Sequence, residues 1–236
     1  IFVLARQLYD EGYDVHVFNE SEQVPPDYRY DEKGVPQAQP RLNPDPEKPK
    51  EQQPPLTATG RAYDEVRSAV NQRNVDQVVA IGYSYGGGAV YYLMWRLEQT
   101  AAGQVQNENI NPFAVPFTAY VDAVQHGNRG PLRKSDDDPI RPVAETRRPS
   151  LSQFHVSYYQ REEPVQEWYR YTVFGRTFTV RVQIHCAATV GSNVNVHVNN
   201  PRIDAQGREL WHGTVDDNDQ VLGAISGHFR NRRVAR

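Results

Sequence analysis

The chain has 236 residues and a formal net charge of -3 at pH 7, from 26 lysines and arginines against 29 aspartates and glutamates. This length fits one domain with a substantial core, and the charge balance creates no overall field that would attract nucleic acid or an anionic membrane. No apolar stretch approaches the roughly 18 residues of a membrane-spanning helix. We therefore expect neither nucleic-acid binding nor a transmembrane segment, and the sequence leaves the oligomeric state open.

Cys186 is the single cysteine of the chain. It excludes an intrachain disulfide and a cysteine-rich zinc site, and its place in an apolar run predicts buried packing rather than nucleophilic chemistry. A lone cysteine favours a reducing, cytoplasm-like compartment. The N-terminus lacks the features of a signal peptide, but the sequence starts at Ile1 rather than methionine, so an upstream targeting signal would not be seen.

Apolar spacing predicts helices and strands in alternation along most of the chain. The expected helices cover about 1–8, 61–73, 85–100 and 218–231, and the expected strands cover about 13–18, 75–82, 117–124, 153–160, 165–190 with a hairpin at Gly175, and 194–198. Such alternation is typical of an α/β fold, with a mostly parallel sheet flanked by helices. We expect one domain over residues 1–236.

Two long polar segments interrupt this alternation. From Pro25 to Pro55 nine of the seventeen prolines gather among charged and amide side chains, which predicts a loop or lid-like insertion. A second loop is expected over residues 127–150. Its acidic run lacks the alternating spacing of a calcium loop, and no His-Glu-x-x-His helix occurs, so we expect no metal site.

The segment Gly82-Tyr83-Ser84-Tyr85-Gly86 joins an apolar strand to a helix. A serine on such a sharp turn takes a strained backbone, and glycines on either side let the strand and the helix pass closely. The pattern is typical of a nucleophile elbow with Ser84 as the nucleophile. A glycine-rich structural turn is the alternative.

A serine hydroxyl becomes a strong nucleophile only when a base removes its proton, so the elbow predicts a histidine and a carboxylate downstream. His212 is the favoured base because it follows the last β-rich region and precedes the final helix. An ordinary loop histidine is the alternative for this position. The other six histidines lie upstream of the elbow, inside predicted strands or helices, or too close behind the candidate acid.

Asp122 is the favoured acid, because it ends the strand that follows the nucleophile helix. It should therefore emerge at the same carboxyl edge of the sheet as Ser84. A strand-end aspartate that caps the next segment is the alternative, and Glu162 or Glu163 is the runner-up as the acid. Asp216 and Asp217 are expected to favour the N-terminus of the last helix through its dipole.

Taken together, the Ser84 elbow, Asp122 and His212 make most of the chain resemble the α/β-hydrolase superfamily, in its lipase and esterase branch. The resemblance implies an ester or lipid substrate, an acyl-enzyme intermediate, no cofactor, and an oxyanion held partly by the backbone N–H of Tyr85. In the family, the second oxyanion donor comes from a loop before the helix that starts here at about Ile1. We therefore expect an N-terminally incomplete chain. A non-catalytic binding or scaffolding protein of this fold, a thioesterase, an acyltransferase and a peptidase are the alternatives.

Overall fold

The computed structural model describes residues 2–18, 28–30, 36–38, 58–124, 146–160, 165–173, 176–184, 186–198 and 215–232. Its centre is a four-stranded parallel sheet in the order β4-β5-β6-β9. The strands are β4 (Gln77–Tyr83), β5 (Ala114–Val121), β6 (His155–Tyr159) and β9 (Val194–His197). The predicted α/β class with a parallel sheet is confirmed.

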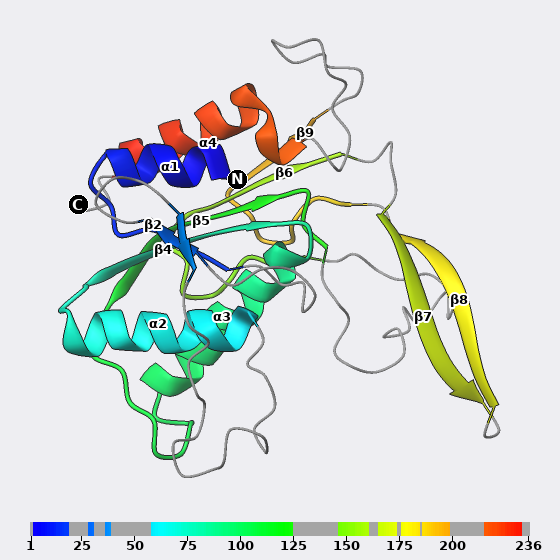
Figure 1. Ribbon diagram of the computed structural model, residues 1–236, viewed down its shortest axis with the longest axis horizontal. Helices are drawn as coiled ribbons and strands as arrows, with labels where there is room; N and C mark the ends of the chain where they lie inside the picture. Colours follow the sequence, from blue (N-terminus) through cyan, green and yellow to red (C-terminus); the bar gives the residue numbers. More distant parts are fainter. Residues whose placement is uncertain are drawn as a thin grey trace.

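Helices cover both faces of the sheet (Figure 1). Helices α1 (Phe2–Asp10) and α4 (Asp219–Asn231) lie together on one face, and α2 (Ala58–Gln72) and α3 (Tyr85–Ala101) lie on the other. Strand β5 is buried over nearly its whole length, from Val115 to Val121. A parallel strand covered on both faces has to be apolar along its length, and this explains the continuous run in the sequence.

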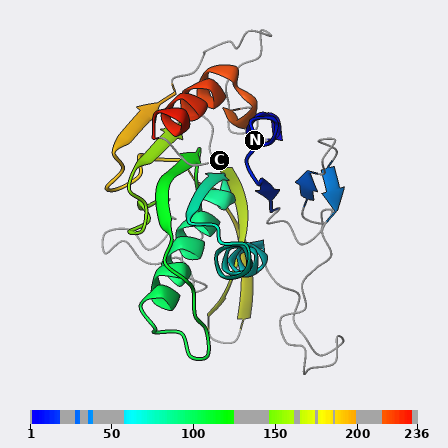
Figure 2. The same cartoon turned by 90° about the vertical axis from the view of Figure 1, so that its left-hand side faces the viewer.

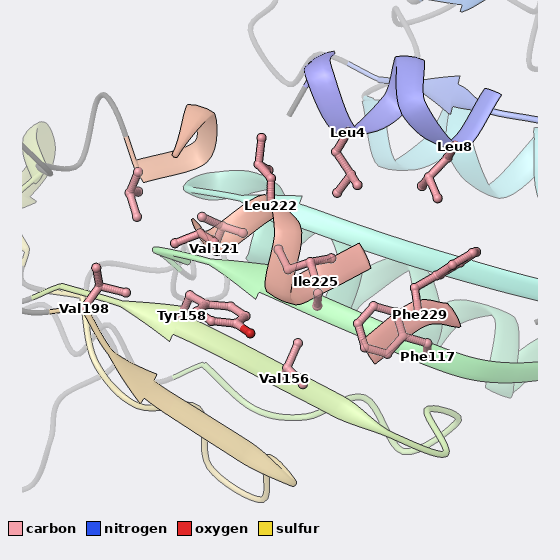
Figure 3. Packing of buried hydrophobic residues seen from close by; sticks show 13 residues of the cluster. Leu4, Leu8, Phe117, Val121, Val156, Tyr158, Val198, Leu222, Ile225 and Phe229 are labelled. Carbon is pink, nitrogen blue, oxygen red and sulfur yellow. The ribbon is translucent and has the colours of Figure 1, made fainter. Parts of the chain in front are cut away.

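The first core lies between the sheet and the pair α1 and α4 (Figure 3). Leucines from α1 and four apolar residues of α4 meet the apolar residues of β5 and β6. The labelled contacts come from Leu4, Leu8, Leu222, Ile225, Phe229, Phe117, Val121, Val156, Tyr158 and Val198. Since α1 and α4 stand at opposite ends of the sequence, this core joins the two ends of the described chain.

The second core lies between the sheet and the pair α2 and α3. Its buried members are Ala62, Tyr63, Val90, Leu93, Met94, Leu97, Val115, Tyr120 and Ala123. Helix α3 contributes four of them at helical spacing, which is the apolar stripe that the sequence predicts for the segment after Ser84. This packing holds α3 against the sheet.

Two smaller sheets stand apart from the parallel one. Strand β1 (His16–Val17) pairs antiparallel with β2 (Tyr28–Tyr30), and β2 pairs with β3 (Pro36–Ala38), a group that Figure 2 shows beside the main sheet. The sequence predicts only a loop from Pro25 to Pro55, and the structure differs from this prediction by placing β2 and β3 there. Strands of three residues in a proline-rich segment leave no readable alternation.

The predicted hairpin about Gly175 is confirmed as β7 (Val165–Val173) paired antiparallel with β8 (Arg176–Ile184). These two strands form a sheet of their own that extends away from the parallel sheet in Figure 1. A 3₁₀ turn, η2 (Val215–Asp217), precedes α4. No helix among the described residues is long and apolar enough to cross a membrane.

Candidate active site at the carboxyl edge of the sheet

Ser84 lies at the turn between β4 and α3 with φ 53° and ψ -125°. This conformation is sparsely populated by residues other than glycine and costs on the order of 1–3 kcal/mol. Neighbouring backbone groups hold it: the Ser84 N–H donates to the Val121 carbonyl at 3.1 Å, and the Ser84 carbonyl accepts from Gly87 at 3.0 Å and from Val124 at 2.8 Å. The structure thus maintains a serine in a strained turn, as the elbow pattern predicts.

The glycines around Ser84 have different roles. A Cβ on Gly82 would lie 2.3 Å from the Gly86 carbonyl oxygen, so Gly82 permits the close approach of β4 and α3. A Cβ on Gly86 would meet nothing within 4 Å. The close contact on the helix is instead made by Gly87, where a Cβ would lie 2.2 Å from that of Ala123.

Asp122 directly follows β5, the neighbour of β4, and the register pairs Tyr83 with Val121. Its backbone is also in the left-handed region, with φ 46°, and its side chain is buried. Backbone hydrogen bonds join Ser84 to Val121, the residue before Asp122, and to Val124, two residues after Asp122. Ser84 and Asp122 are therefore neighbours at one edge of the sheet, as predicted from their positions at strand ends.

The Asp122 carboxylate accepts two hydrogen bonds from one residue, Gln160. The Gln160 backbone N–H donates to Oδ1 at 2.9 Å and its side-chain Nε2 donates to Oδ2 at 3.0 Å. Gln160 follows β6 directly and is buried. Gln160 is absent from the predicted site, although a polar residue directly after a predicted buried strand is the signal that points to it.

Cys186 is buried, as predicted, and its thiol donates to the Asp122 backbone carbonyl at 3.4 Å. Burial and the nearby Asp122 raise the pKa of this thiol far above its ordinary value. A thiol that stays protonated is a poor nucleophile. Cys186 therefore packs behind the site, in a cluster with Val124 and Tyr159, against which Tyr85 lies.

Tyr85 is the first residue of α3. The first N–H groups of a helix have no carbonyl partner within it, and the helix dipole is positive at this end. The backbone N–H of Tyr85 lies at this positive end of α3, directly after Ser84, and its role as an oxyanion donor stays a prediction.

Among the described histidines, His197 is the one at the carboxyl end of a strand in the parallel sheet. It ends β9, is exposed, and stacks on Tyr159 with ring centroids 5.2 Å apart. His16 lies by Asp14 and Glu65, His155 begins β6, and His228 is in α4. The predicted base, His212, lies outside the described residues, as do Glu162 and Glu163.

The described residues contain no group of three histidine, cysteine, aspartate or glutamate side chains that would hold a metal ion. No family model matches the chain, and searches of curated proteins and of solved structures find no significant match.

Proposed function

We propose that the chain is a serine hydrolase of the lipase and esterase type, with an α/β-hydrolase-like fold, that cleaves a small-molecule or lipid ester. The strained backbone of Ser84 between β4 and α3 carries the proposal. A turn with only a structural role would be relieved by glycine, which takes positive φ without cost. A serine in such a strained strand-to-helix turn is typical of a nucleophile elbow, in which the hydroxyl is presented to the substrate.

In the proposed reaction, Ser84 Oγ attacks the ester carbonyl carbon while its proton passes to His212. The tetrahedral intermediate is held partly by the Tyr85 N–H and collapses when the C–O bond to the alcohol breaks, with the alcohol taking the proton from His212. Water then repeats the sequence on the acyl-enzyme and releases the carboxylic acid and free Ser84. Asp122 holds the imidazole in the required tautomer throughout.

The test is labelling with a fluorophosphonate, followed by mass spectrometry of the modified peptide. We expect stoichiometric label on Ser84 and none in Ser84→Ala, with the melting temperature nearly unchanged, because alanine has the same backbone preference as serine at positive φ. Ser68→Ala, a change on α2 away from the site, is the control and should label as the wild type does. A folded wild-type protein without label would contradict the proposal and favour a non-catalytic binding protein.

The base is tested by a matched pair of variants. His212→Gln should slow labelling by on the order of a thousandfold or more, because the serine then has no base. His197→Gln should leave the rate unchanged. The opposite ranking would identify His197 rather than His212 as the base. A panel of oxygen esters, thioesters and peptides would identify the bond that the protein cleaves.

A further inference from the structure

The Asp122 side chain is buried, with 0% of the residue exposed, and a buried carboxyl group needs hydrogen-bond partners. Gln160 supplies two, one from its backbone to Oδ1 and one from its side chain to Oδ2. Because the two donors belong to one residue and reach both oxygens, they define the plane of the carboxylate as well as its position.

Gln160 lies at the end of β6, next to residues that hydrogen-bond to the neighbouring strands. It is 1% exposed and directly follows Tyr159, whose carbonyl accepts from the Val198 N–H at 2.8 Å. One residue earlier, the Tyr158 carbonyl accepts from the Asp122 N–H at 2.6 Å. Asp122 and Gln160 are thus attached to adjacent parallel strands, and the sheet determines their distance.

The chemistry of the amide matters. Glutamine donates from Nε2 at every pH, whereas a glutamate in its place would be a second acceptor and would share a proton with Asp122. If Asp122 and Gln160 served only to fill the core, two apolar side chains of similar volume in their place would give a protein of equal or greater stability. A buried carboxylate with a fixed plane, one strand from Ser84, fits a role in orienting the base.

We propose that Gln160 is a positioning residue that fixes the Asp122 carboxylate, and that this makes Asp122, rather than Glu162 or Glu163, the acid of the site. This inference rests on the proposed serine hydrolase function. Gln160 acts through Asp122 and touches no reacting atom.

The experiment measures the rate of fluorophosphonate labelling of Ser84 from about pH 5 to about pH 9, a range that includes the titration of histidine. The variants are Gln160→Met, Gln160→Glu, Asp122→Asn and the double change Gln160→Met with Asp122→Asn. Methionine keeps the volume of glutamine and removes the side-chain donor. Thr118→Val is the control, because it deletes the buried hydrogen bonds of the Thr118 hydroxyl to His155 and Ser152, earlier in β5 than Asp122.

Gln160→Met should slow labelling by roughly ten- to a hundredfold at all pH values, which is typical for the loss of one hydrogen bond to a charged group. In the Asp122→Asn background, Gln160→Met should slow labelling little further, because the carboxylate through which Gln160 acts is already absent. Compared with the wild type at the same pH, Gln160→Glu should be slowed least at low pH, where a shared proton can bridge the two carboxyl groups, and most at high pH, where that proton is lost. Thr118→Val should show no such pH-dependent slowing relative to the wild type.

Three results would overturn the inference. Gln160→Met could melt at a lower temperature yet label at the wild-type rate, which would make Gln160 purely structural. The rate reduction in the double variant could equal the product of the reductions in Gln160→Met and Asp122→Asn, which would show that the two residues act independently. If the folded wild-type protein does not label at Ser84, the proposed function itself fails, and the inference fails with it.

Discussion

At the scale of single residues, Gly82 and Gly86 flank Ser84 symmetrically in the sequence but not in space. A Cβ on Gly82 would overlap the Gly86 carbonyl at 2.3 Å, and backbone atoms cannot move aside easily, whereas a Cβ on Gly86 enters open space. We expect Gly82→Ala to lower the free energy of unfolding by at least about 1–3 kcal/mol, the usual cost of overpacking. Gly86→Ala should be neutral or stabilising by up to about 1 kcal/mol, because alanine favours a helix. Urea unfolding measures both, and equal losses would refute the assigned roles.

At the scale of the elements, α3 approaches the segment after β5 so closely that Gly87 and Ala123 leave room for only one methyl group. Gly87→Ala should therefore destabilise the protein, although alanine is the better helix former. Adding Ala123→Gly should recover much of the loss, with a coupling energy of about 0.5–3 kcal/mol in a double-mutant cycle. Thermal unfolding of the two single variants and the double variant gives this energy. Strictly additive effects would show that the helix moves away instead.

At the scale of the whole molecule, stability should fall in mild acid because of His155. Its ring is buried against Tyr120 and Thr118, and burial, with a smaller effect of Arg148, lowers its pKa to about 3. The unfolded chain binds this proton below about pH 6.5, so the free energy of unfolding should decrease as pH falls from about 6.5 towards about 3, by at most about 1.4 kcal/mol per pH unit. Urea unfolding at about pH 7.5 and about pH 5 measures the slope.

His155→Asn keeps a polar side chain without a titrating group and should reduce this pH dependence, whatever its effect on stability at neutral pH. His228 is the matched control, because burial lowers its pKa as well but it lies in α4 and is less buried. His228→Gln should reduce the slope by a smaller amount. An unchanged slope in His155→Asn would show that other groups control the acid loss.

Two features are readable from local sequence patterns alone: the class of the fold and the position of the strained turn at Ser84. Local periodicity is enough for both: apolar runs at β4 and β5, helical spacing in α3, and glycines around a serine. The prediction for the last helix was also close, since α4 begins at Asp219. Its N-cap is Asn218, whose side chain accepts from the Gln220 and Val221 N–H groups. Asp216 and Asp217, which the sequence predicts to favour the N-terminus of this helix, lie just before its N-cap, in the 3₁₀ turn η2.

Which residues meet across the sheet depends on the tertiary packing. Gln160 and Asp122 are far apart in the sequence and are joined because β5 and β6 pair in a particular register, which no local pattern encodes. The same holds for the contact between Gly87 and Ala123, and for the core that brings α1 against α4. The helix and strand patterns are short-range properties of the chain, whereas strand order and register depend on how the whole core packs, and the geometry around Ser84 follows from that packing.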